Sequence, residues 1–138
     1  MKLKPGIFLS AIVLFSFSFI SFHPQKFDLK ASIERGKEVY VSYCITCHME
    51  DGKGIEDQYP PLAKSDYMMA DKTRSIQQVL YGAYGEMTVN GKTYNDDMKG
   101  SELNDDEASD LLNYIRNSWG NKGAAIMPAD IKAARKPE

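Results

Sequence analysis

Cys44 and Cys47 are the only two cysteines in the 138-residue chain, and His48 follows the second one directly. Cys-x-x-Cys-His is the pattern for covalent attachment of a c-type haem. The spacing has a chemical reason, because two thiols three positions apart can each add to one vinyl group of a porphyrin while the next imidazole binds the iron. We therefore predict one covalent haem c, held by Cys44 and Cys47, with His48 as an axial iron ligand.

A Cys-x-x-Cys pair also occurs in redox dithiols of the thioredoxin kind, in zinc sites and in structural disulfides. A thioredoxin-like pair follows a strand in a βαβ pattern, whereas this pair closes a helix-like segment. A zinc site needs further ligands, and the other histidine of the chain, His23, lies in the N-terminal segment. The histidine at position 48 therefore favours haem over these alternatives.

The chemistry of such an iron depends on its sixth ligand. An open position allows oxygen or peroxide chemistry, whereas a methionine thioether closes the position and favours a reversible one-electron carrier. Of the seven methionines, Met1 lies in the N-terminal segment, Met49 is adjacent to the axial histidine, and Met127 follows the last core helix. The residues alone leave four candidates: Met68, Met69, Met87 and Met98.

Hydrophobic periodicity and capping signals predict the helices that position these groups. Asn104 and Glu107 have the spacing of a capping box, so a helix is expected to begin there and to end at Gly120. Asn90-Gly91 predicts a hairpin turn between two short strands. The predicted helices cover about residues 32–43, 72–81 and 104–119, and a short fourth helix follows Pro128.

Gly36 stands in the middle of the first predicted helix. A glycine there costs about 1 kcal/mol relative to alanine, so we interpret it as a point of close approach by another helix. The expected partner is the apolar stripe of the third helix, which should pack on the first helix at Gly36 and Tyr40. The stripe consists of Ala108, Leu111, Leu112, Ile115 and Trp119.

The first 22 residues have the composition of an export signal. Lys2 and Lys4 precede a largely apolar run, residues 7–20, which is the order expected of a secretory peptide. The run is shorter than the roughly 20 residues that span a bilayer, which favours cleavage over an uncleaved anchor. We predict a signal peptide or N-terminal membrane anchor in residues 1–22, a linker in 23–30 and the folded domain in 31–138.

The order of these features along residues 32–119 resembles the class I c-type cytochromes. A helix enters the haem motif, and residues 51–54 (Asp-Gly-Lys-Gly), residues 59–62 (Tyr-Pro-Pro-Leu), a methionine loop and a closing helix follow. The resemblance implies an all-α cytochrome c fold, with three core helices and a short C-terminal helix around one haem. Residues 89–94 and 114–121 look like cytochrome modules of bacterial periplasmic dehydrogenases, nitrite reductases or terminal oxidases.

The same resemblance implies roles for single residues. It assigns the sixth iron ligand to Met98, although the family usually has proline next, and Lys99-Gly100 here leaves the loop less stiff. It assigns the hydrogen-bond acceptor of His48 to the carbonyl of Pro60, for which a stiff turn is the alternative. Tyr94 is expected on the methionine side of the haem, or else as a core aromatic residue.

The chain has 17 basic and 19 acidic residues. Seven acidic residues gather near the methionine loop, either as an acidic docking rim or because carboxylates favour a helix N-terminus. No basic patch with interleaved aromatic residues is present, so nucleic acid is not an expected partner. The seven residues are Asp96, Asp97, Glu102, Asp105, Asp106, Glu107 and Asp110.

These observations predict an exported electron carrier, in the periplasm or on the outer face of the inner membrane. It would exchange single electrons with a donor and an acceptor protein, with no small-molecule substrate and no catalysis of its own. Membrane association would come from the N-terminal segment. Two alternatives remain open: an electron-transfer subunit of a larger oxidoreductase, and a haem enzyme or ligand sensor with a labile sixth ligand.

Overall fold

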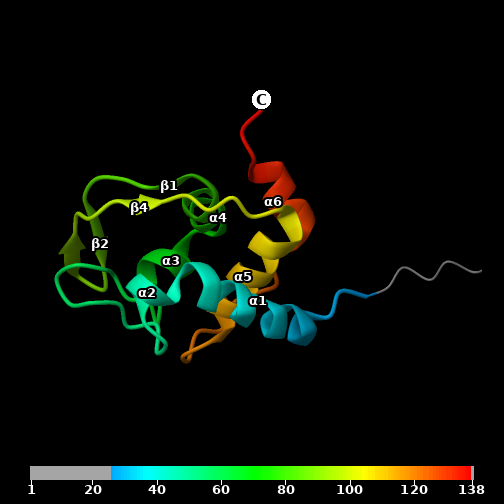
Figure 1. The fold of residues 1–138 in the computed structure, drawn as a ribbon, viewed down its shortest axis with the longest axis horizontal. Coiled ribbons are helices and arrows are strands. Elements are labelled where there is room, and N and C mark those ends of the chain that lie inside the picture. Colours follow the sequence, from blue (N-terminus) through cyan, green and yellow to red (C-terminus); the bar gives the residue numbers. More distant parts are fainter. Residues whose placement is uncertain (1–25, 138) are drawn as a thin grey trace, which may run out of the picture.

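The computed structural model describes residues 26–137, so the predicted export segment lies outside the described residues. Within this range, none of the helices combines the length and the apolar character that crossing a membrane requires. The fold is mostly helical with a few very short strands, and the predicted all-α class is confirmed (Figure 1). The helices are α1 (Leu29–Tyr43), α2 (Ile45–His48), α3 (Asp66–Ala70), α4 (Lys72–Tyr81), α5 (Asp105–Asn117) and α6 (Pro128–Ala134).

Helix α1 begins three residues before its predicted start. Its N-cap is Asp28, whose side chain accepts a hydrogen bond from the backbone N–H of Ala31 at 3.1 Å. Such a cap satisfies one of the free N–H groups of the first turn. Leu29 and Lys30, which the sequence assigned to the linker, therefore belong to the helix.

Helices α1 and α5 pack against each other, and Gly36 lies at their contact (Figure 1). A Cβ atom at position 36 would lie 1.9 Å from the carbonyl oxygen of Asp110, so the predicted close approach is confirmed. The contacted face of α5 differs from the prediction, because Gly36 meets Asp110 and Tyr114 rather than the apolar stripe. The stripe residues Leu111, Leu112 and Ile115 instead line an internal cavity.

The predicted capping box of α5 is confirmed. The Asn104 side chain accepts from the backbone of Glu107, and the Glu107 side chain accepts from the backbone of Asn104, both at 3.0 Å. The helix ends earlier than predicted, at Asn117, because the chain reverses at Trp119 with a φ of 52°. The Trp119 ring still reaches the α1 contact, with its centroid 5.1 Å from that of Tyr40.

Two pairs of short strands complete the described fold. The predicted hairpin joins β2 (Met87–Val89) to β3 (Lys92–Tyr94) in antiparallel register. A second antiparallel pair, β1 (Gly82–Ala83) with β4 (Met98–Lys99), was not predicted. Because β1 directly follows α4, this second pair attaches the methionine loop to the end of that helix.

Candidate haem-binding site

A cavity of about 400 Å³ lies between the Cys-x-x-Cys-His segment, helices α3, α4 and α5, and the loop around Met98. Its volume falls within the roughly 300–1,000 Å³ that small-molecule and cofactor sites occupy. The cavity wall from α5 is apolar and consists of Leu111, Leu112 and Ile115. A flat, largely apolar cofactor would therefore be buried against the closing helix.

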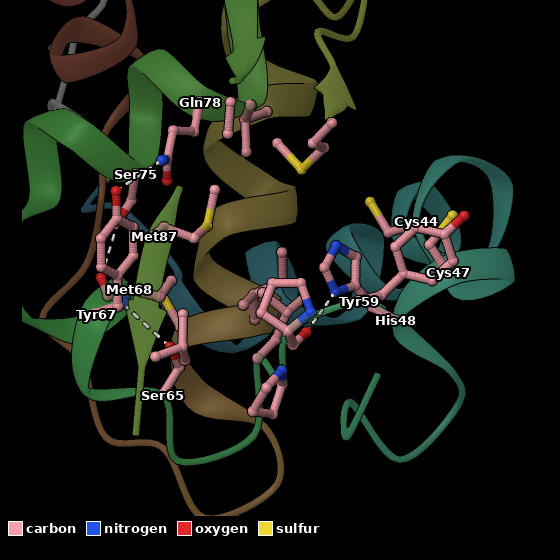
Figure 2. A pocket seen from close by; sticks show the side chains of 18 of the residues that line it. Cys44, Cys47, His48, Tyr59, Ser65, Tyr67, Met68, Ser75, Gln78 and Met87 are labelled. Carbon is pink, nitrogen blue, oxygen red and sulfur yellow. Dashed lines mark hydrogen bonds between the residues drawn. The ribbon is translucent and has the colours of Figure 1, made fainter. Parts of the chain in front are cut away.

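Cys44, Cys47 and His48 all line this cavity (Figure 2). The two cysteines are not joined in a disulfide. Burial, with a smaller contribution from Cys47, raises the pKa of the Cys44 thiol to about 11, so this thiol is protonated at neutral pH. The single turn of α2 and Cys44, the residue before it, thus present two thiols and an imidazole to one space.

His48 is 8 % exposed, and its Nδ1 lies 3.0 Å from the carbonyl oxygen of Pro60. A carbonyl oxygen can only accept, so Nδ1 donates and Nε2 is left without a proton. Burial lowers the pKa of His48, although the contact with Pro60 opposes this effect, and the ring is neutral at neutral pH. A neutral imidazole with a fixed tautomer is the form that binds metal.

The loop after α2 folds back to bring Pro60 to the histidine. Gly54 has a φ of +70°, and its backbone N–H donates to the carbonyl of His48 at 3.1 Å. A Cβ atom at position 54 would lie 2.2 Å from the carbonyl oxygen of Tyr59, so only glycine fits this contact. The glycine at position 54 is therefore explained by the backbone contact that positions Pro60.

Three of the four candidate methionines line the cavity: Met68, Met87 and Met98. Met69 is not among the lining residues and packs against the hydrophobic core. Met98 lies on β4, paired with Ala83, and a Cβ atom on Gly82 would lie 2.3 Å from the Met98 carbonyl. Met87 lies on the hairpin, on the other side of the space from Cys44, Cys47 and His48 (Figure 2).

Tyr94 is buried on β3, opposite Met87 in the hairpin register. It is not among the residues that line the cavity, whereas Val89 of the same hairpin is. Directly paired residues, and residues two apart in one strand, lie on the same face of a hairpin, so Tyr94 shares its face with Met87 and Val89 although it does not line the cavity with them.

Polar side chains gather at the end of the cavity that is remote from the two cysteines (Figure 2). Gln78 donates to the hydroxyl of Tyr67 at 3.1 Å, and Ser75 donates to the carbonyl of Met68 at 2.8 Å. Ser65 caps α3 by accepting from the backbone of Met68 at 3.2 Å. The thiols lie at one end of the cavity, beside Tyr59, and the other end holds the hydroxyl and amide groups of Ser65, Tyr67, Ser75 and Gln78 (Figure 2).

The cytochrome c family model matches residues 33–119, more than half of the chain and the part that forms this cavity. The chain belongs to the cytochrome c family. Membership implies a haem c cofactor, as the motif at residues 44–48 predicts.

Relatives of this cytochrome include cytochrome c subunits of dehydrogenases and a cytochrome c-552. It is 34% identical over 105 residues to the cytochrome c subunit of an alcohol dehydrogenase (quinone) from Gluconobacter oxydans, covering 72% of this chain. It is 35% identical over 111 residues to the gluconate 2-dehydrogenase cytochrome c subunit of Pantoea cypripedii, covering 76% of this chain. It is also 34% identical over 91 residues to cytochrome c-552 of Thermus thermophilus, covering 62% of this chain.

The match spans different shares of these relatives. It covers 22% of the Gluconobacter subunit and 25% of the Pantoea subunit, but 69% of the Thermus cytochrome c-552. The cytochrome therefore corresponds to about a fifth to a quarter of the dehydrogenase subunits and to most of the Thermus protein.

Two arginines behind the polar end of the cytochrome's cavity were missed by the sequence reasoning. Arg74 lies 3.9 Å over the ring of Tyr67, and Arg116 donates to the carbonyl of Met68 at 3.1 Å. Within residues 26–137 neither arginine forms an ion pair, and the Nε of each is buried without a partner. Burial lowers the pKa of Arg116. The polar end is therefore positively charged without a matching carboxylate.

The sequence contained a weak signal for this feature. Arg116 is the only basic residue in α5, which begins with three acidic residues, and it lies on the buried side of that helix. A charged side chain in a buried position is rare unless it is paired. No motif, however, linked it to Arg74 or to the cavity.

Proposed function

We propose that this cytochrome carries single electrons between a donor protein and an acceptor protein through one haem c. Cys44 and Cys47 would hold the haem, and His48 and Met98 would be the axial ligands of its iron. The observation that carries the proposal is the single cavity onto which both thiols, the buried imidazole and the Met98 side chain converge. Haem iron with histidine and methionine ligands alternates between the ferrous and ferric states at a raised potential.

Attachment needs only the two thiols. Each S–H would add across one vinyl C=C bond and form one S–C bond and one C–H bond, so no oxidant or reductant would be consumed. Cys44 and Cys47 are separated by one turn of backbone and both line the cavity, which suits two neighbouring vinyl groups. The haem would then remain bound in both oxidation states and even in the unfolded chain.

The polar end of the cavity supports one orientation of the haem. A porphyrin with vinyl groups near Cys44 and Cys47 has its two carboxylates on the opposite edge, where Tyr67 and Gln78 lie. The uncompensated charges of Arg74 and Arg116 behind these side chains favour anionic groups there. This arrangement would place the carboxylates near Arg74 and the buried Arg116 and would fix the plane of the haem.

The ligand set supports an electron carrier rather than an enzyme. His48 is held by Pro60 in the tautomer that leaves Nε2 free, and Met98 would close the opposite side of the iron. A closed sixth position leaves no site for a small-molecule substrate. The rival function, a haem enzyme or sensor with a labile ligand, requires a vacant or easily vacated position.

The relatives support a further proposal about partners. Two of them are named as cytochrome c subunits of dehydrogenases, so the donor for this chain would be a larger oxidoreductase. We place the protein in the periplasm or on the outer face of the inner membrane, with residues 1–22 as signal or anchor. Co-purification with a dehydrogenase and sequencing of the mature N-terminus would check these two points.

The decisive experiment combines denaturing electrophoresis and an absorption spectrum. Wild-type protein should keep haem through electrophoresis, and the variant with both Cys44→Ala and Cys47→Ala should lose it. The oxidised wild type should show a methionine-to-iron charge-transfer band, which Met98→Ala abolishes and the matched control Met87→Ala retains. Haem retained by the double cysteine variant would overturn the attachment, and a high-spin ferric wild type that binds cyanide at once would favour the enzyme.

A further inference from the structure

Residues 120–137 follow the family match and pack back onto the cytochrome body. We call residues 126–136 the C-terminal strap. Its first residue is fixed to α5: the Ile126 N–H donates to the Asn113 side chain at 2.7 Å, and the Ile126 carbonyl accepts from Asn113 and Ser109, each at 2.8 Å. Ile126 and Ile131 are fully buried, so the strap belongs to the folded body.

The far end of the strap binds on both sides of the segment that carries Met98. Arg135 Nε lies 2.7 Å from Asp105 Oδ1, and a second guanidinium nitrogen donates to the carbonyl of Leu103 at 2.7 Å. The Lys136 N–H donates to the hydroxyl of Tyr81, the last residue of α4, at 2.7 Å. In Figure 1 the yellow chain from β4 to α5 accordingly passes beside both α4 and α6.

Between these anchors, residues 98–103 lie directly on the end of α4. The backbone N–H of Ser101 donates to the carbonyl of Val79 at 2.9 Å, and a Cβ atom on Gly100 would lie 2.5 Å from the Leu80 carbonyl oxygen. Neither Lys99 nor Gly100 restricts its own φ as a proline would. The position of Met98 therefore depends on contacts from outside the loop.

We propose that the C-terminal strap is a positioning element for Met98. Arg135 and Lys136 hold residues 98–104 against α4 and so slow the departure of the thioether from the iron. This inference rests on the proposed function, because it takes Met98 as the sixth ligand. Arg135 contacts neither the cavity nor the iron site, and it acts only through the backbone of Leu103 and the side chain of Asp105.

The test measures how fast cyanide replaces methionine on the ferric iron of the full-length haem protein. Cyanide can bind only after Met98 has left, so its rate reports the opening of the loop. Arg135→Gln removes the guanidinium that binds both Asp105 and the Leu103 carbonyl, and we expect a rate about tenfold higher, equivalent to about 1.4 kcal/mol. Tyr81→Phe removes only the acceptor of the Lys136 N–H and should raise the rate by a smaller factor.

Lys132→Gln is the matched control. It removes one positive charge from an exposed position of α6 whose side chain has no ion pair among the described residues, and it should leave the rate unchanged. Testing Arg135→Gln in the Met98→Ala protein as well separates an effect on the position of Met98 from a general destabilisation of the fold. In Met98→Ala protein the sixth position is already open, so adding Arg135→Gln should not change the cyanide rate.

The outcomes distinguish the two proposals. Wild-type cyanide rates in both Arg135→Gln and Tyr81→Phe, with a fast rate in Met98→Ala, would overturn the strap and leave the proposed function intact. An equal acceleration by Arg135→Gln with and without Met98 would also overturn it. An unchanged charge-transfer band in Met98→Ala would instead show that the ligand assignment itself is wrong.

Discussion

Replacing Gly36 by alanine tests the contact between α1 and α5 directly. The added Cβ would lie 1.9 Å from the carbonyl oxygen of Asp110 and 2.8 Å from the Cβ of Tyr114. The nearest atom belongs to the backbone, so a rotamer change cannot relieve the overlap and α1 must move. Overpacking costs about 1–3 kcal/mol, and because the obstructing atom belongs to the backbone, we expect a cost near the upper end of that range. Alanine recovers about 1 kcal/mol of helix propensity, which leaves a net loss of about 2 kcal/mol.

Urea denaturation of the oxidised haem protein would measure this loss. With a denaturant dependence of about 2 kcal/mol/M, typical of a small protein, the midpoint should fall by about 1 M. Gly36→Leu should lower it further. Lys37→Ala, at the adjacent exposed position of the same helix, is the control and should leave the midpoint nearly unchanged. An equal midpoint for Gly36→Ala and wild type would refute the close-approach argument.

Three further predictions concern the potential, the partner and the strap. Potentiometric titration should give a lower reduction potential for Met98→Ala and an unchanged one for Met87→Ala, because thioether ligation favours ferrous iron. Electron transfer to a basic redox protein should slow as salt rises, and Asp96→Asn with Asp97→Asn should flatten that dependence, unless these carboxylates serve only solvation. Hydrogen bonding from the Met127 N–H, and then pairing with Lys72, lowers the pKa of Asp130. The Asp130 carboxylate therefore stabilises the fold above the pKa of about 3.9 that it has in the unfolded chain, and this stabilisation is lost as the pH falls through its lower pKa in the folded protein. Unfolding of Asp130→Asn should accordingly depend less on acid than that of wild type.

The acidic residues near the methionine loop had two interpretations, a docking rim or local helix stabilisation. The structure separates the residues into one group with local contacts and one group without. Asp105 pairs with Arg135, Asp110 pairs with Arg35, and Glu107 completes the capping box. These three carboxylates have local structural roles. Among the described residues, four carboxylates of this group form no ion pair and stay available to a basic partner: Asp96, Asp97, Glu102 and Asp106.

The longer elements were predictable because their signals are local. The α5 capping box, the proline that opens α6 and the Asn-Gly turn each act within four residues. Helix α3 was missed because it has only five residues, too few to show a periodic pattern. It is specified instead by the Ser65 cap and by hydrogen bonds from Arg74 and Arg116 to its carbonyls.

The features that shape the cavity were less predictable because they depend on contacts between distant residues. The β1–β4 pair joins two-residue strands, and Arg116 reaches Met68 across 48 positions of sequence. Tyr94 illustrates the limit for single residues. Its aromatic type indicated burial, and its register places it on the face of the hairpin that carries Met87 and Val89, yet it does not line the cavity with them.

Helix α5 connects the haem motif to the opposite wall of the cavity, although α5 and the motif are far apart in the sequence. One side of α5, at Asp110 and Tyr114, meets Gly36 of α1, and the other side, at Leu111 and Leu112, lines the cavity. A displacement of α1 at Gly36 therefore moves both the segment that carries Cys44 and the wall opposite it. Close packing transmits such shifts because a well-packed interior has little free volume to absorb them. The α1–α5 contact thus stabilises the fold and also fixes the dimensions of the cavity in which the haem would be held.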